Sequence, residues 1–141
     1  MKGIVTKLDT EKFELHIFSL SNEHDDQTEV AKRKADRFHV GVWDIRQWAN
    51  KIIHSEIDIL CFPSYLNAPG RPIMEAGFFK VPSISCIDYP LNDTFIDGKT
   101  GFSITPGDYK SLANKIIYFY NNPKKRQEMG FNVYKLSVKN F

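Results

Sequence analysis

The stretch IDILCFPSYLNAPGRPIMEAGFFKVPSISCI, residues 57–87, decides the fold class of this chain. It opens with a continuous apolar run at 57–62, which is typical of a strand buried on both faces. A turn rich in proline and glycine follows, then a short helix over about 73–79 and a second apolar run at 83–87. A strand, a helix and a strand in this order predict one unit of a parallel sheet.

The same alternation continues on both sides of this stretch. Strands are expected at 13–20 and 38–42, and the run 96–104 predicts a tight turn into a short strand, with Gly98 and Gly101 in unusual backbone conformations. Helices are expected at 3–9, 28–38, 43–56, 108–122 and 123–138, with Asp44 and Asp108 as possible caps. The predicted fold class is therefore α/β, a doubly wound parallel sheet of Rossmann type.

Composition limits the classes of protein that fit. The 141 residues, with 42% hydrophobic residues and eleven Phe, suit a single folded domain over 1–141. A net charge of +2 gives no support for binding nucleic acid. No run approaches the roughly 20 apolar residues of a membrane span, and 1–13 lacks the apolar core of a signal peptide. Cys61 and Cys86 are expected to be buried free thiols, as in a protein of the reducing cytoplasm. The histidines are scattered along the chain and predict no metal site.

Ligands of doubly wound sheets bind beyond the carboxyl ends of the strands, which here means the loops 19–26, 42–45 and 63–73. In the third loop, a helix beginning near Pro72 would offer free N–H groups and a partial positive charge to an anion. Gly70 permits close approach and Arg71 adds a cation. Glu75, expected in the first turn, could accept hydrogen bonds from a ribose. The alternative is that Glu75 only complements the helix dipole and Arg71 points into solvent.

Several motifs in order carry a family resemblance. The segment FPSYLNAPGRPIMEAGFFKVPSIS is followed by PLNDTFIDGKTGFSITPGDYKSLANKI and by NNPKKRQEMG. With these motifs the chain resembles the C-terminal, donor-binding domain of GT-B-fold retaining glycosyltransferases, most closely over 57–131. The resemblance implies the second half of a GT-B fold without its first strand. It also implies an incomplete chain at both ends, because the family has a separate acceptor-binding domain.

The resemblance also implies roles for particular residues. Glu75 matches the glutamate that holds the nucleotide ribose, and Asn67 stands where a first glutamate contacts the donor sugar or its phosphate. Lys2 aligns with the lysine that neutralises the donor diphosphate, and Val42 falls where a loop lies against the base. Arg71 and Asn67 are the expected catalytic residues, and the expected donor-binding set is Lys2, Val42, Gly70, Arg71, Pro72, Ile73 and Glu75.

This sequence departs from the family pattern at several points. Asn67 replaces a carboxylate, Lys80 stands where glycine is usual, and Gly77 interrupts the predicted helix. A glycine inside a helix costs about 1 kcal/mol relative to alanine. In agreement with the family, this sequence has no D-x-D triplet that would hold a nucleotide-bound metal, so no metal cofactor is expected.

The expected function is the binding of a nucleotide-diphosphate sugar for transfer of its glycosyl unit to an acceptor hydroxyl with retention. A separate acceptor-domain protein or self-association is expected for this. Peripheral contact with the inner membrane face is a further possibility, suggested by the basic run NPKKRQ at 122–127. Two alternatives stay open. One is a non-catalytic remnant or partner subunit used for protein interaction, and the other is a nucleotide-binding domain unrelated to sugars.

Overall fold

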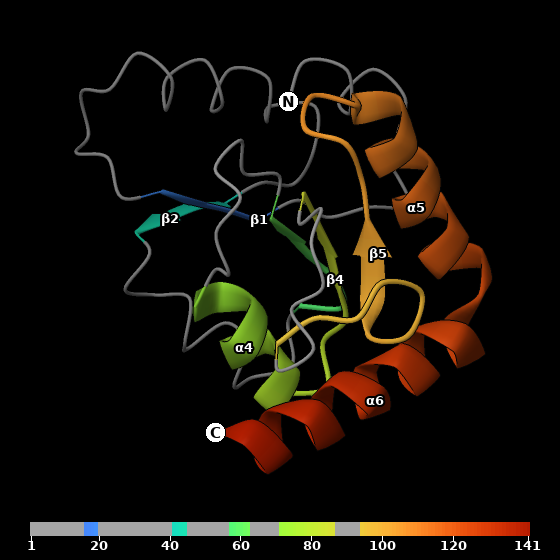
Figure 1. Ribbon diagram of the computed structural model, residues 1–141. Helices are drawn as coiled ribbons and strands as arrows, with labels where there is room; N and C mark the ends of the chain where they lie inside the picture. The colour runs from blue at the N-terminus through green and yellow to red at the C-terminus, as the bar shows by residue number, and fades with distance from the viewer. Residues whose placement is uncertain (1–15, 20–40, 45–56, 63–70, 87–93) are drawn as a thin grey trace.

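The computed structural model describes residues 16–19, 41–44, 57–62, 71–86 and 94–141 (Figure 1). The strands are β1 (His16–Ser19), β2 (Gly41–Asp44), β3 (Leu60–Phe62), β4 (Ser83–Ser85) and β5 (Gly101–Ser103). The helices are α4 (Arg71–Phe78), α5 (Tyr109–Asn121) and α6 (Pro123–Asn140). Among these residues, no helix is both long enough and apolar enough to cross a lipid bilayer.

The strands pair in parallel, as the sequence predicts. β4 lies between β3 and β5, with Ile84 opposite Cys61 on one side and Phe102 on the other. β1 and β2 form a separate parallel pair, with His16 opposite Gly41. Every described pairing is therefore parallel, and the carboxyl ends of β3, β4 and β5 meet at one edge of their sheet.

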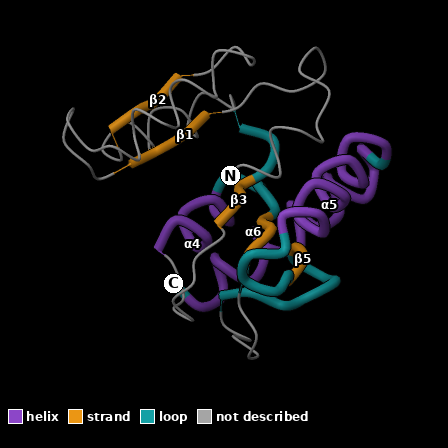
Figure 2. Tube along the Cα trace, turned by 90° about the horizontal axis from the view of Figure 1, so that it is seen from above, coloured by secondary structure: helices purple, strands orange, loops and turns teal. Residues whose placement is uncertain are grey.

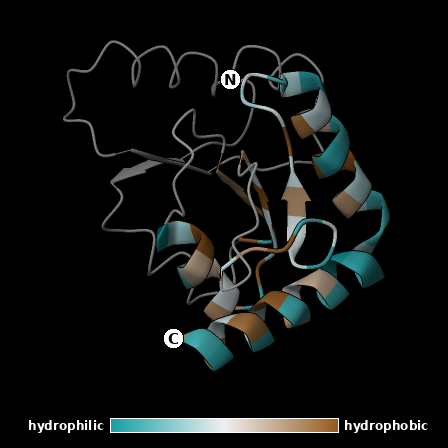
Figure 3. Cartoon of the chain, viewed as in Figure 1, coloured by the Kyte–Doolittle hydropathy of each residue, from teal (hydrophilic) through white to brown (hydrophobic). Residues whose placement is uncertain are grey.

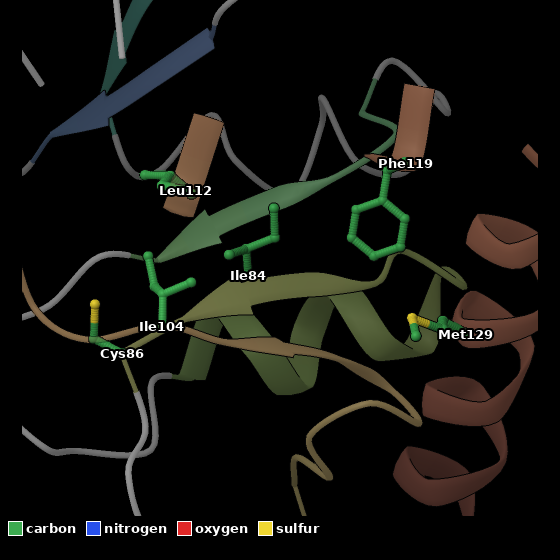
Figure 4. Close-up of a cluster of buried hydrophobic side chains, with 6 residues drawn as sticks. All are labelled: Ile84, Cys86, Ile104, Leu112, Phe119 and Met129. Atoms are coloured by element: carbon green, nitrogen blue, oxygen red, sulfur yellow. The ribbon is translucent and has the colours of Figure 1, made fainter. Parts of the chain in front are cut away.

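Helices cover both faces of the β3–β4–β5 sheet, and Figure 2 shows α4 and α5 on opposite sides of β3. Alternation along the strands divides the core in two. On the α4 face the buried residues are Leu60, Ile73, Ala76, Val81 and Phe95. On the α5 face they are Ile84, Cys86, Ile104, Leu112, Phe119 and Met129 (Figure 4). This arrangement confirms the doubly wound α/β class.

α6 packs against the amino-terminal end of the sheet (Figure 1). The Asn132 side chain donates to the Lys99 carbonyl, 3.1 Å away, in the turn that precedes β5. Gly130 lies so close to the Lys80 carbonyl, just before β4, that a β-carbon there would overlap it. α6 also lies against α4, since a β-carbon at Gly77 would overlap the Ser137 hydroxyl. Gly77, which was expected to interrupt a helix, thus lets two helices approach closely.

Within the described residues, the strands follow the predicted order, but several bounds differ. β1 lies inside the predicted strand 13–20, and β3 and β4 occupy parts of the apolar runs at 57–62 and 83–87. β2 extends two residues beyond the predicted end of the strand 38–42, so Trp43 belongs to a strand rather than to a helix. Asp44 ends this strand, and the helix that it was expected to cap is not among the described residues. The helices expected at 3–9 and 28–38, and the rest of 43–56, lie outside the described residues.

The two glycines of the turn before β5 have different roles. Gly98 has φ 73°, as expected of a turn glycine, and its N–H donates to the Gly101 carbonyl over 2.9 Å. Gly101 has no such left-handed conformation, which makes that part of the prediction wrong. A β-carbon at Gly101 would overlap the Ser83 carbonyl of β4, so close strand packing explains this glycine.

The helix predictions for the second half of the chain are confirmed. α5 begins after Asp108, whose carboxylate accepts from the Ser111 N–H (3.0 Å) and the Ser111 hydroxyl (2.6 Å). α5 ends before Pro123, which occupies the first turn of α6, where a missing N–H costs nothing. α6 runs two residues beyond the predicted end, to Asn140.

Candidate functional site

The candidate site lies where α4 begins, after the carboxyl end of β3. β3 ends at Phe62 and α4 starts at Arg71, so the chain passes from the carboxyl edge of the sheet to the helix N-terminus over residues 63–70, which the structure does not describe. In parallel α/β sheets this edge is the usual ligand-binding position. The first N–H groups of a helix lack intrahelical partners and carry a partial positive charge. This end of α4 is therefore suited to an anionic ligand.

Three of the predicted residues form the first turn of α4, and each offers a different group. Arg71 is exposed, so its guanidinium can reach a ligand. Pro72 is half-buried and has no N–H, but its fixed φ suits the start of a helix. The Ile73 side chain is fully buried in the core with Leu60 and Val81. Ile73 can therefore offer its backbone to a ligand, and its side chain instead anchors the helix to the sheet.

Glu75 lies one position later in the helix than expected. α4 begins at Arg71 and has no acidic residue in its first turn, so Glu75 opens the second turn. The expectation that Glu75 lies in the first turn was therefore wrong. The alternative, in which Glu75 only complements the helix dipole, is also weakened, because the dipole effect fades after the first turn. Arg71 and Glu75 are four residues apart, which puts both on one face of α4. The half-buried Glu75 carboxylate and the exposed Arg71 guanidinium therefore lie on the same side of the helix.

The other predicted site residues are less fully placed. Val42 lies within β2, where the structure gives its backbone pairing with Ile17. Lys2, Asn67 and Gly70 lie outside the described residues, so their roles stay predictions. The structure thus brings Arg71, Pro72, Ile73 and Glu75 together on one helix.

The far end of α4 is fixed by a hydrogen-bonded cap. The Lys80 N–H donates to the Gly77 carbonyl (3.1 Å) and the Val81 N–H to the Ala76 carbonyl (3.0 Å). These two bonds form a Schellman motif, in which Lys80 takes the left-handed position with φ 61°. The family pattern has glycine at this position, and glycine adopts the left-handed conformation without strain. Lys80 adopts the same conformation despite its β-carbon. Val81 and Ala76 pack together in the core, which holds the helix at its angle to the sheet.

Sequence reasoning missed two buried hydroxyls on β4. Ser83 and Ser85 are 1% and 0% exposed, and neither Oγ has a hydrogen-bond partner among the described residues. Ser85 ends β4, at the same edge of the sheet from which the loop to α4 leaves. Two serines within the apolar run 81–87 were the available signal.

The cysteines are poor candidates for a nucleophile. Both are free thiols, and burial raises the pKa of Cys61 to about 12 and also raises the pKa of Cys86. Since the thiolate is the reactive form, both thiols are unreactive near neutral pH. The described residues contain no group of three His, Cys, Asp or Glu side chains that could hold a metal ion.

Comparisons with known proteins agree with this geometry. The family model described as "Glycosyl transferases group 1" matches residues 20–136. The capsular polysaccharide biosynthesis glycosyltransferase CapM of Staphylococcus aureus is 30% identical over 79 residues, which are 56% of this chain and 21% of CapM.

Two solved structures show the same fold over nearly the whole chain. TarM of S. aureus, in complex with UDP and other ligands, has a TM-score of 0.78 at 21% identity, covering 99% of this chain and 28% of TarM. HepE of Anabaena, in complex with UDP-glucose, has a TM-score of 0.80 at 18% identity, covering 99% of this chain and 39% of HepE. The chain thus spans between about a fifth and two fifths of the proteins that it matches.

Proposed function

The chain belongs to the glycosyl transferases group 1 family, and we propose that it forms the donor-binding part of a glycosyltransferase that uses a nucleotide-diphosphate sugar. The observation that carries this proposal is the start of α4, where Arg71 and Glu75 share one helix face beyond the carboxyl edge of a parallel sheet. Neighbours with the same fold were solved with UDP or UDP-glucose, which supports a nucleotide ligand.

The proposed contacts follow from the chemistry of the donor. The diphosphate lies at the α4 N-terminus, where it accepts hydrogen bonds from backbone N–H groups and from the Arg71 guanidinium. The Glu75 carboxylate accepts hydrogen bonds from the ribose hydroxyls. Gly70 lets the loop backbone approach the phosphates, Lys2 adds a second cation, and the β2 end near Val42 lies toward the base. Asn67 contacts the sugar through its amide.

The transfer step depends on leaving-group stabilisation. The bond between the anomeric carbon and the diphosphate oxygen breaks while a bond from that carbon to the acceptor oxygen forms, and the acceptor proton passes to the departing diphosphate. Negative charge grows on the diphosphate as its bond to the sugar breaks. Arg71 and the α4 N-terminus are stronger partners for that charge than for the intact donor, which lowers the barrier. In this proposal transfer proceeds with retention, without a protein nucleophile and without a bound metal. The acceptor is held by a separate domain or a partner protein.

Isothermal titration calorimetry of the full chain with UDP, GDP and ADP tests the proposal. We expect binding of at least one nucleotide, and about tenfold or greater weakening in Glu75→Ala, because a hydrogen bond to a charged group is worth about 1.5–3 kcal/mol. The 2′-deoxy nucleotide, which keeps only the 3′-hydroxyl, should bind the wild type more weakly than the ribonucleotide does and should lose less affinity in Glu75→Ala. Arg71→Ala should weaken binding of the diphosphate but not of the nucleoside.

Glu128→Gln is the matched control, because it removes an exposed carboxylate of α6 far along the chain from the site. It should bind as the wild type does. Absence of heat with all three nucleotides, or equal binding by Glu75→Ala and wild type, contradicts the proposal. The first result would favour the non-catalytic alternative, to which the amide of Asn67 in place of a carboxylate also points.

A further inference from the structure

The outward face of α6 exposes large apolar side chains that the proposed donor site does not use. Phe131 and Val138 are 50% and 53% exposed and lie seven residues apart, hence on the same side of the helix. Phe141, directly after the helix, is 60% exposed. Scattered apolar residues are normal on a protein surface, but apolar residues aligned along one helix face mark an interaction surface.

Lysines accompany these apolar side chains on the same face. Lys124, Lys135 and Lys139 are all exposed, and helical spacing places them beside Phe131 and Val138. The Lys135 ammonium lies 4.9 Å from the centroid of the Phe131 ring, so the two side chains form a cation–π contact on this face. The acidic residue on this side, Glu128, is paired with Lys125 at 3.1 Å. The face is therefore both apolar and positively charged, and Figure 3 shows brown and teal residues alternating along α6.

The inward side of α6 is already occupied. Gly130 contacts the Lys80 carbonyl and Asn132 donates to the Lys99 carbonyl, both at the amino-terminal end of the sheet. The outward face is thus directed away from the carboxyl edge, where α4 begins. A partner on α6 would leave the proposed donor site open.

We propose that the outward face of α6, made of Lys124, Phe131, Lys135, Val138, Lys139 and Phe141, docks on the surface of an anionic lipid bilayer. The aromatic and aliphatic side chains enter the boundary between headgroups and acyl chains. The lysines lie along the same plane, where their long stems extend toward the headgroup phosphates. Each lysine near an anionic membrane contributes about a fivefold gain in partitioning.

A second copy of this chain fits the face less well than a membrane does. A two-fold contact places the same surface on both partners, so the lysines of one α6 would face the lysines of the other. Like charges across an interface are unfavourable, whereas anionic headgroups complement all three lysines. The basic charge of the face therefore selects a negatively charged surface.

Co-sedimentation of the full chain with lipid vesicles tests the proposal. One set of vesicles is phosphatidylcholine alone, and the other is phosphatidylcholine mixed with phosphatidylglycerol. We expect binding to the mixed vesicles, weaker binding to the neutral ones, and loss of binding as salt is raised. Phe131→Ser should reduce partitioning about fivefold to tenfold, and the double variant Lys135→Gln/Lys139→Gln about fivefold for each lysine removed.

Two matched controls lie on α5. Tyr120→Ser removes an aromatic side chain that is 45% exposed, and Lys110→Gln removes an exposed lysine. Both controls should bind mixed vesicles as the wild type does, and circular dichroism should show that all variants remain folded. Glu75→Ala should also bind vesicles normally, which separates this proposal from the one for the donor site.

Four results would overturn the proposal. The first is failure of the wild type to bind the mixed vesicles, and the second is equal binding of the wild type to neutral and mixed vesicles. The third is unchanged binding by both α6 variants. The fourth is a dimer in gel filtration that Phe131→Ser converts to a monomer, because the occupant of the face would then be a second copy.

Discussion

Among single residues, Lys80 has the least favourable backbone conformation that the structure describes. Its φ of 61° is left-handed, and the β-carbon makes this conformation cost about 1–2 kcal/mol. Glycine adopts it freely but loses more chain entropy on folding. We therefore expect Lys80→Gly to raise the free energy of unfolding by about 1 kcal/mol, measured by urea denaturation.

Lys80→Ala is the control for this prediction. It keeps the β-carbon, and so the strained φ, but removes the lysine that lies 5.3 Å from the Tyr134 ring centroid. The alanine variant should be no more stable than the wild type. If alanine stabilises as much as glycine does, the gain does not come from the backbone conformation.

Between elements, the contact of α4 with α6 depends on the missing side chain of Gly77. In an exposed helix, Gly→Ala gains about 1 kcal/mol. Here a new β-carbon would overlap the Ser137 hydroxyl and lie 3.0 Å from a Val133 methyl carbon. We expect Gly77→Ala to lower the free energy of unfolding by about 1–2 kcal/mol, since overpacking forces the helices apart.

A double variant isolates this contact. Ser137→Ala removes the hydroxyl that the new β-carbon meets, so Gly77→Ala/Ser137→Ala should recover part of the loss in a double-mutant cycle. Full additivity of the two changes in chemical denaturation would mean that Gly77 does not act through Ser137.

The three glycines show how far the sequence could predict this fold. Apolar runs and proline positions predicted the strands and helices, because these patterns are local. Gly98 was also predictable, since a turn needs its φ of 73°. Gly77 and Gly101 were not, because their reasons are a hydroxyl 60 residues away and a carbonyl on the neighbouring strand. Close contacts between elements leave no periodic signal in a single sequence.

The same limit applies to the candidate site. The sequence located the loop and its helix, because glycine, proline and arginine at a strand-to-helix junction suit an anion. It placed the start of the helix near Pro72, one residue after the observed start at Arg71, so Glu75 was expected one position too early in α4. The buried hydroxyls of Ser83 and Ser85 escaped notice, because only the packed sheet removes them from water.

The start of α5 carries a pH-dependent contribution to stability. Hydrogen bonds from the Ser111 hydroxyl and N–H hold the pKa of Asp108 below its ordinary value of 3.8. A pKa that is lower in the folded state means that this contribution is present above that value and is lost as the pH falls through the folded-state pKa. We expect the thermal midpoint to fall at acidic pH, partly through this residue.

Asp108→Asn and Asp108→Ala separate the charge from the cap. Asparagine also caps helices, so Asp108→Asn should keep most of the stability at neutral pH and reduce the acid dependence of the thermal midpoint. Asp108→Ala should lower the midpoint at neutral pH as well. An acid dependence in Asp108→Asn equal to that of the wild type would assign the effect to other carboxylates.

For the molecule as a whole, α6 connects the two layers of the core. Met129 is 1% exposed and packs with Ile84 and Phe119 on the α5 face (Figure 4). Four residues later, Val133 lies against Gly77 of α4, which covers the opposite face of the sheet. One helix therefore contacts both layers, so we expect the layers to unfold together.

Met129→Ala tests this coupling through hydrogen exchange. Loss of a buried methionine side chain costs about 2–5 kcal/mol, which corresponds to an acceleration of exchange through global unfolding between roughly 30-fold and several thousandfold. The Leu60 N–H bonds the Pro82 carbonyl and the Ile104 N–H bonds the Ser85 carbonyl, which gives one probe on each side of β4. Both amides should accelerate by the same factor, whereas the exposed substitution Gln127→Ala should change neither. Faster exchange at Ile104 with unchanged exchange at Leu60 would mean that the layers open independently, and that α6 does not couple them.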